Sequence, residues 1–386
     1  KTNGHIRAIL ELFHVKSYLG YTATPFANVL QDRNEKPEND WIIPYKFKDD
    51  QVEKQLKRVN NIFPDDFIEL LNPPSNYVGA KQIFDTITPI DNQTDDNEKI
   101  PLVAPAVNDY IENFPSRLYQ NDYGETVGLE NIRSRNEWDE KFGFDGYLDF
   151  SSYTDYRKET WAPRKEDIFP KELPESLKTA IKCFIIALTV REIRKPGMIK
   201  SDLYQPHNTM LVHVSRFTFW QNTTKRLIDD YLNKLISRIN NEKPSSSTSI
   251  YNELKKLWFG SHGFAHIVEN IKSYLPKGYE DEFMSPLVFD SLIPVFAEAV
   301  KDIEVKAINS FTKDSLEYPK NSPKKYIAIG GNRLSRGFTL EGLTINYFIR
   351  VTNYSDALLQ MGRWFGYRPG YLDCCKIFTT QDSLHK

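Results

Sequence analysis

Residues Lys325–Arg350, "KYIAIGGNRLSRGFTLEGLTINYFIR", hold two apolar runs on either side of a segment rich in glycine and arginine. The first run ends in Gly330 and Gly331, and the second is made mostly of β-branched and aromatic residues. Short runs of this composition, bounded by glycine and polar residues, are typical of buried strands. We therefore expect two strands of one sheet here.

Other predicted strands alternate with helices around this pair. The further strands are "NTMLVHVSR", "VKAIN" and "CCKIFTT". The predicted helices are "PESLKTAIKCFIIALTVREIRK", with its apolar stripe of Leu177, Ala180, Ile181, Phe184, Ile185 and Leu188, and "FWQNTTKRLIDDYLNKLISRI". Strands that alternate with helices predict an α/β fold with a parallel sheet.

We expect four parts along the chain. Residues 1–30 hold a short amphipathic helix and a β-rich stretch, "SYLGYTA"; residues 31–173, rich in Asn, Asp and Pro, form an inserted region of loops and α-helices. Residues 174–204 form a connecting amphipathic helix, and residues 205–386 form the α/β domain.

The composition restricts the classes of function. Lys and Arg number 50 against 52 Asp and Glu, so a nucleic-acid site must be local rather than spread over the whole surface. Three cysteines make no disulfide framework, which favours a reducing compartment. No apolar run reaches the ~18 residues that a membrane span needs, and no signal peptide opens the chain. We expect a cytoplasmic protein that is not in a membrane.

Glycine and arginine follow the predicted strands, where ligands of parallel sheets bind. Gly330 and Gly331 allow the backbone to approach a ligand closely. Arg336 and Arg363 can each make bidentate contacts to phosphate oxygens. An arginine at a γ-phosphate also stabilises the charge of the phosphoryl-transfer transition state. These residues predict a site for a nucleotide phosphate.

The stretch "QMGRWFGYR", Gln360–Arg368, sets two arginines five residues apart among glycines and aromatic residues. Such a setting favours arginines that are held in place. We interpret Arg363 and Arg368 as side chains of which one or both meet a phosphate at a fixed position.

Several motifs occur in the order found in superfamily-two helicases: "TAT" at Thr22–Thr24, then "SRGFTLEGL", then "QMGRWFGYR". With "GYTATPFAN", "IFPDDFIEL", "MLVHVSR" and "IAIGGNRLSRGFTLEGL", the chain from Gly20 to about Thr380 resembles the Z1 domain family. That family is a helicase-related group of endonucleases associated with restriction and other phage-conflict systems.

The resemblance implies the end of a first RecA-like lobe, then a second RecA-like lobe from about residue 205. It implies that Thr22 and Thr24 couple the nucleotide state to lobe movement, and that Gln360, Arg363 and Arg368 face the nucleotide. The implied nucleotide or interlobe face also includes Gly330, Gly331, Arg336 and Gly337. Nucleic-acid contacts are assigned to Ser215, Arg216 and Arg333. ATP and Mg²⁺ are the implied cofactors, and DNA and other subunits of a restriction or defence system are the implied partners.

Two elements of a complete ATPase are missing from this sequence. It has no GxxxxGK[ST] loop, and no acidic pair follows an apolar strand. Because these elements precede "TAT" in helicases and the chain begins at Lys1 without methionine, we expect them in a missing N-terminal ATPase lobe. The chain alone is not expected to hydrolyse ATP. Thr339 stands where many helicases have Asp, and the arginine motif is one residue longer than usual, so the identity of the finger arginine stays open.

Two other classes of function stay open. One is a nucleic-acid-binding or scaffold module without catalysis. The other is a Mg²⁺-dependent nuclease at Glu304-Val305-Lys306, with Asp290 or Asp302 as a second acid. We assign no metal site: "HGFAH", His262–His266, has the spacing of a helical metal pair but lacks the Glu of HExxH. His213 is interpreted as a core histidine.

Overall fold

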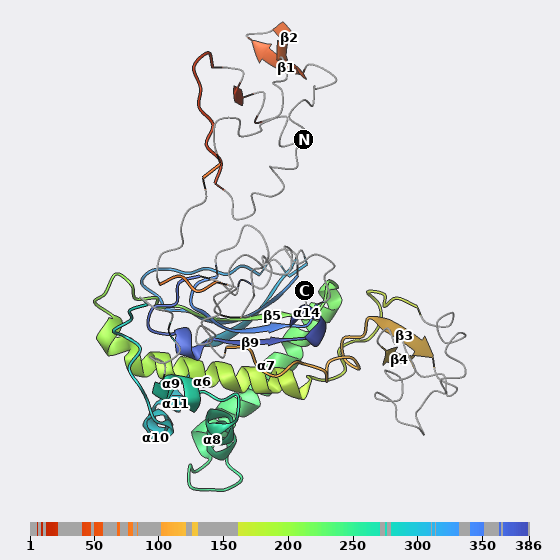
Figure 1. The fold of residues 1–386 in the computed structure, drawn as a ribbon. Coiled ribbons are helices and arrows are strands. Elements are labelled where there is room, and N and C mark those ends of the chain that lie inside the picture. Colours follow the sequence, from red (N-terminus) through yellow and green to blue (C-terminus); the bar gives the residue numbers. More distant parts are fainter. Residues whose placement is uncertain are drawn as a thin grey trace, which may run out of the picture. The chain divides into compact units, whose positions relative to one another are not determined.

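A computed structural model gives the fold of the chain (Figure 1). The structure describes residues 6, 9–10, 13–21, 41–47, 50–56, 68–69, 76–79, 83, 102–120, 126–129, 161–270, 275, 279–309, 311–312, 314–331, 340–350, 363 and 366–384. The chain divides into two compact units, Lys1–Pro73 and Pro74–Lys386.

The first unit contains an antiparallel hairpin of β1 (Trp41–Phe47) and β2 (Asp50–Leu56). Its pairing runs from Trp41 opposite Leu56 to Phe47 opposite Asp50, and aromatic and β-branched residues in β1 favour this conformation. The predicted strand at "SYLGYTA" is wrong for the residues described, because Ser17–Tyr21 are exposed and have no strand partner.

The second unit is built on a five-stranded parallel sheet with the order β6-β7-β5-β8-β9. All five predicted strands are confirmed. Their bounds are Asn208–His213 for β5, Ile303–Ile308 for β6, Lys325–Gly330 for β7, Leu343–Phe348 for β8 and Lys376–Thr379 for β9. The fold is therefore α/β, as the alternation of strands and helices predicts.

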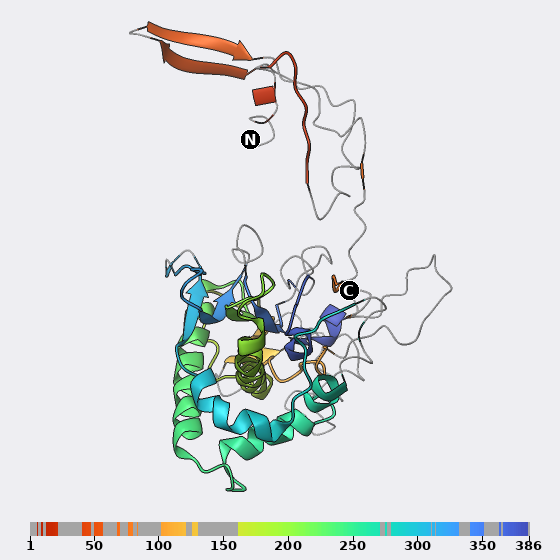
Figure 2. The same cartoon turned by 90° about the vertical axis from the view of Figure 1, so that its left-hand side faces the viewer.

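Two long helices cover one face of the sheet. α6 (Glu175–Met198) packs on β8 and β9, and α7 (Thr218–Asn241) packs on β6 and β7 (Figures 1 and 2). The predicted apolar stripe of α6 is buried, but the helix is not amphipathic: Cys183, Ile186, Ala187 and Val190 are buried as well. A second layer of helices explains this, since it covers the side of α6 that faces away from the sheet.

That outer layer consists of short helices. They are α8 (Ile250–Phe259), α9 (Ala265–Asn270), α10 (Phe289–Leu292) and α11 (Phe296–Ala299), with the 3₁₀ turn Ile293–Val295 between the last two. Of these, α8, α10 and α11 contact α6. The 3₁₀ turn Leu372–Cys374 precedes β9, and α14 (Gln381–Leu384) follows it.

The region 31–173 differs from the expectation of loops and helices. Its described residues contain the β1–β2 hairpin and a second antiparallel pair, β3 (Arg117–Gln120) with β4 (Thr126–Leu129). Part of it also joins the core, because residues 102–107 run along β9. There Ile377 donates its backbone N–H to the carbonyl of Leu102, at 2.8 Å, and accepts one from Ala104, also at 2.8 Å.

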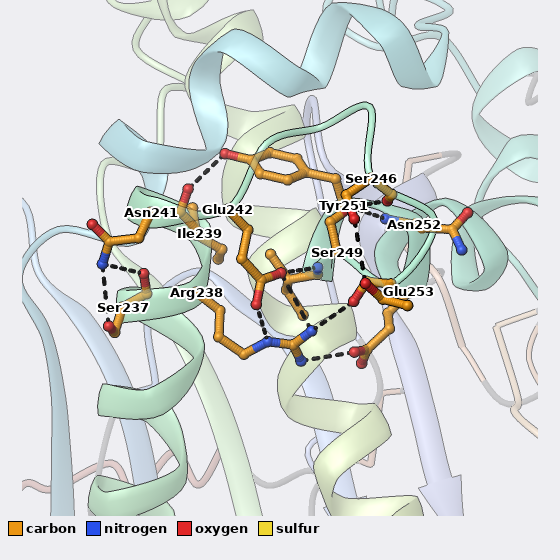
Figure 3. Close-up of polar contacts among 12 residues, drawn as sticks. Ser237, Arg238, Ile239, Asn241, Glu242, Ser246, Ser249, Tyr251, Asn252 and Glu253 are labelled. Carbon is orange, nitrogen blue, oxygen red and sulfur yellow. Dashed lines mark hydrogen bonds and ion pairs between the residues drawn. The ribbon is translucent and has the colours of Figure 1, made fainter.

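A polar network holds the corner between α7 and α8 (Figure 3). Arg238 contacts Glu242 at 2.6 Å and Glu253 at 2.7 Å, and Glu253 also pairs with Lys182 of α6 at 3.0 Å. Glu242 accepts the backbone N–H of Ile250, which begins α8. The polar segment 241–249 thus forms a fixed corner that joins α6, α7 and α8.

Candidate phosphate-binding edge of the sheet

The strand order creates a switch point between β5 and β8. The chain leaves β5 toward β6 on one side of the sheet and leaves β8 toward β9 on the other. In open parallel sheets, ligands bind beyond the carboxyl ends of strands at such a point. The residues that follow β5, β7 and β8 therefore define the candidate site, which we call the carboxyl edge.

Four segments meet at the carboxyl edge. Ser215 follows β5, Gly331 follows β7, Arg350 follows β8, and Gln221 belongs to the first turns of α7. A Cβ atom added to Gly331 would lie 3.0 Å from Gln221 Nε2, 3.5 Å from an Arg350 guanidinium nitrogen and 3.6 Å from the Ser215 carbonyl oxygen. A side chain at position 331 would crowd this junction, so glycine fits it best.

Two arginines give the carboxyl edge its charge. Arg350 is half-buried, and its pKa is lowered by burial and by the positive charge of Arg216. Arg216 is exposed, lies 5.0 Å from the ring centre of Phe217, and has no acidic partner in the described part of the chain. Two neighbouring guanidinium groups repel each other, and a bound anion would relieve that repulsion.

The amino terminus of α7 points its backbone donors at the same edge. No side chain caps α7, and its first turn contains no acidic residue. The first N–H groups of a helix lack partners within the helix and carry a partial positive charge. Gln221, which is buried, donates through Nε2 to the Ser215 carbonyl at 2.9 Å, while its Oε1 has no hydrogen-bond partner among the described residues. Helix donors, arginines and a glycine make a site suited to phosphate.

Arg363 and Arg368 lie together at the other end of the sheet. With Thr344 near the start of β8 and Lys376 at the start of β9, they line a cavity of about 20 Å³. Arg363 has φ 50°, a left-handed conformation uncommon for residues other than glycine. Arg368 donates to the carbonyls of Tyr367, at 3.1 Å, and Arg363, at 3.3 Å. A cavity of this volume has room for about one water molecule.

A buried ion pair anchors the loop that carries these arginines. Arg194 of α6 contacts both carboxylate oxygens of Asp373 at 2.7 Å and donates to the Gly370 carbonyl at 3.1 Å. Gly370 has φ 74°, and its N–H donates to Asp281 at 2.6 Å. The residues that follow Arg368 are therefore held by two partners, Arg194 and Asp281.

The structure thus divides the predicted site residues into two groups. Ser215, Arg216, Gly330 and Gly331 meet at the carboxyl edge, whereas Arg363 and Arg368 lie at the amino ends of β8 and β9. Thr22, Thr24, Arg333, Arg336, Gly337 and Gln360 lie outside the described residues. Sequence reasoning missed Gln221 and Arg350. Arg350 could have been found, because it is the last residue of a predicted strand, "TINYFIR".

The alternative nuclease residues form an ion-pair cluster on β6. Glu304 pairs with Lys306 and with Lys324, both at 3.0 Å. The hydrogen bond from Lys324 is the main cause of a lowered Glu304 pKa, and Lys306 adds to it. No group of three or more His, Cys, Asp or Glu residues that could hold a metal ion occurs in the part of the chain that the structure describes.

The structure also bears on two predictions about histidines: the helical spacing of His262 and His266, and the core position of His213. His262 and His266 do not form a helical pair, because α9 begins at Ala265. Gly263 lies before α9, where an added Cβ would be 2.2 Å from the Trp258 carbonyl oxygen. His213 is fully buried at the end of β5, with its ring 5.3 Å from that of Phe348, as expected for a core histidine.

The fold and site define a class: a parallel α/β domain with arginines and a close-packed glycine at its switch point. The comparison with protein families agrees with the resemblance seen in the motifs. Residues 176–386 match the Z1 domain, so the chain belongs to the Z1 domain family. The match begins in α6 and includes the whole sheet; "GYTATPFAN" and "IFPDDFIEL" precede it. No curated protein and no solved structure matched the chain. Among the described residues, no helix has the length and apolar character needed to cross a membrane.

Proposed function

We propose that the carboxyl edge binds the phosphate backbone of DNA. We further propose that this α/β domain is a second RecA-like lobe in the nucleic-acid-dependent ATPase or translocase part of a restriction or phage-defence endonuclease. The observation that carries the proposal is the convergence of Arg216, Arg350, the close-packed Gly331 and the uncapped amino terminus of α7. Arginine and helix N–H groups are common phosphate contacts in protein–DNA complexes.

Exposure favours a polymer backbone over a small enclosed ligand. Arg216 is on the surface and Arg350 is half-buried, so an extended chain of phosphates can reach both. Phosphate contacts of this kind bind nucleic acid without reading its sequence. The overall charge of −2 fits a local site rather than a general attraction to DNA.

ATP and Mg²⁺ are the cofactors that this proposal implies. The carboxyl edge carries groups that suit a phosphate, because Arg216 and Arg350 lie beside the uncapped amino terminus of α7. The described residues offer no acidic cluster for Mg²⁺, so we assign the metal to none of them. When bound, ATP would supply the free energy of phosphoryl transfer. The arginine-finger role of Arg363 or Arg368 is part of the proposal and needs its own test.

Fluorescence anisotropy with a labelled oligonucleotide tests the proposal. We expect Arg216→Ala and Arg350→Ala each to weaken DNA binding for all sequences alike. Each lost phosphate contact should reduce the slope of log K against log salt by about 1. Lys255→Ala, which changes an exposed charge on α8, is the matched control. Unchanged affinity and salt slope in both arginine variants would overturn the assignment of the carboxyl edge.

A non-catalytic nucleic-acid-binding or scaffold module is the second candidate. Arg368 donates to the Tyr367 and Arg363 carbonyls, and both arginines line a cavity with room for about one water molecule, so a structural role favours this candidate. DNA binding that depends on Arg216, with no DNA-stimulated ATP hydrolysis by the complete protein, would support this candidate over the motor.

A further inference from the structure

Two aromatic side chains are exposed beside the carboxyl edge. Phe219, in the first turn of α7, is 48% exposed, and Phe311, which follows β6, is 80% exposed. Both belong to segments that begin or end at the edge where Arg216 lies. Large apolar side chains that remain this exposed next to a charged site are candidates for contact with a ligand.

A chain of hydrogen bonds sets Phe311 against α7. Asn309 donates through Nδ2 to Asn222 Oδ1 at 3.0 Å, and Asn222 lies one helical turn after Phe219. The Oδ1 atom of Asn309 accepts the backbone N–H groups of Phe311, at 2.9 Å, and Thr312, at 3.0 Å. Asn309 itself is buried. The turn is thus held by a buried amide, and it presents Phe311 near the face of α7 that carries Phe219.

Positive charge flanks the two rings. Arg216 precedes α7, and Arg226 follows Phe219 by seven residues, so Arg226 lies on the same face two turns later. Arg226 is exposed and has no acidic partner in the part of the chain that the structure describes. Figure 2 shows α7 as the long green helix beside the cyan strand β6. Phe311 follows the carboxyl end of that strand in the sequence. Along α7, cationic side chains therefore lie on both sides of Phe219.

We propose that this face binds single-stranded nucleic acid, with unpaired bases stacked on Phe219 and Phe311 and backbone phosphates at Arg216 and Arg226. The inference rests on the proposed function and adds the class of substrate. Grooves that bind single strands combine a positive path for the backbone with aromatic rings for the bases, and stacking needs bases that are not paired. A purely apolar partner would not make use of the arginines on either side.

Anisotropy titrations with a labelled dT 20-mer and with a duplex of equal length test this inference. Phe219→Ala and Phe311→Ala should each weaken binding of the single strand by about 5- to 150-fold. Duplex binding, which depends on the arginines, should change far less. Phe311→Tyr keeps a stacking ring and should keep the affinity, whereas Phe311→Leu keeps only apolar area and should lose it. Phe259→Ala removes a similarly exposed ring at the end of α8 and is the control.

The outcomes separate this inference from the proposed function. Loss of single-strand binding in both alanine variants, with recovery in Phe311→Tyr, supports it. If the arginine variants lose DNA binding but the phenylalanine variants bind both DNAs normally, the stacking inference is overturned and the phosphate site stands. If no variant differs from the original protein in DNA binding, both the stacking inference and the phosphate site are overturned. Equal loss of duplex and single strand in the phenylalanine variants would also contradict stacking.

Discussion

The buried ion pair between Arg194 and Asp373 gives a stability prediction that the structure defines closely. Arg194 is 1% exposed and Asp373 is not exposed at all. The substitution Asp373→Asn removes the negative charge and leaves the guanidinium buried. Burial alone would lower the pKa of Arg194, but the charge of Asp373 and the hydrogen bonds to it raise the pKa above its ordinary value. Because a guanidinium group is not deprotonated in proteins even when it is buried, Arg194 stays charged in the variant.

The expected cost follows from what remains around that charge. Two backbone carbonyls, of Gly370 and Ser285, still accept hydrogen bonds from Arg194, but neither supplies a neutralising charge. Breaking a buried pair by removal of one partner costs about 3–5 kcal/mol. This is a large share of the ~5–15 kcal/mol by which domains are stable. The double variant Arg194→Met with Asp373→Leu leaves no charge and should recover most of the loss.

Urea unfolding followed by tryptophan fluorescence measures this cost. Trp220 and Trp258 are buried in the core of the same unit and report its loss. Asp229→Asn is the control, because it breaks the surface pair of Asp229 with Lys225, a contact worth about 0.5 kcal/mol or less. If Asp373→Asn costs no more than Asp229→Asn, the argument from desolvation is refuted. A double variant as unstable as the single one would show instead that packing dominates.

Three further predictions concern pH, glycine and catalysis. Burial lowers the pKa of His207, whose Nδ1 accepts a backbone N–H at 3.1 Å. Stability should therefore fall as the pH drops below about 6.5, where the unfolded chain takes up the proton. His207→Gln should flatten that fall in urea midpoints taken at pH 7.5 and 5.5, by at most about 1.4 kcal/mol per pH unit. Gly342→Ala should destabilise by about 3 kcal/mol or more, because φ is 63° and the new Cβ would lie 1.7 Å from a carbonyl oxygen. Thermal melts of this variant can be compared with those of Gly197→Ala, in the last turn of α6. A Cβ added at Gly197 would have no atom within 4 Å, so this variant should be more stable by about 0.5–1 kcal/mol. In the complete protein, alanine at Arg363 or Arg368 should reduce DNA-stimulated ATP hydrolysis by about 10³- to 10⁵-fold if that arginine is the finger. Unchanged rates in both variants would leave these arginines with a role in the loop alone.

Most of the sheet could be predicted because its strands are short, apolar and bounded by polar or glycine residues. Residues 208–213 and 325–330 show this pattern, and both strands formed where expected. The surroundings of α6 could not be predicted in the same way. Its stripe indicated one buried face, but burial of its other faces depends on α8, α10 and α11, which follow it much later in the chain.

The site was predictable in part, for the same reason. Gly331 closes a predicted strand, so the rule for parallel sheets found it, whereas the resemblance to the Z1 domain family supplied Ser215 and Arg216. Gln221 could not be found, because its place depends on how α7 leaves β5. The anchor of the arginine loop was equally hidden, since Arg194 and Asp373 are 179 residues apart in the sequence. Contacts over such distances leave no local pattern.

The two outer strands of the sheet are protected in different ways. Residues 102–107 cover β9 with backbone hydrogen bonds. On β6, side chains serve this purpose: Asp314 accepts the N–H of Ala307, and Thr312 donates to its carbonyl. Glu304 and Lys306 place charges along the same strand.

An unprotected outer strand can pair with the strand of another molecule, and charged residues oppose this. The residues that suggested a nuclease thus have a consequence for self-association. A variant with Glu304→Val and Lys306→Val would present β6 as an apolar outer strand that can pair with the same strand of another molecule. Its tendency to aggregate at high concentration should rise even if its fold and its DNA binding are unchanged.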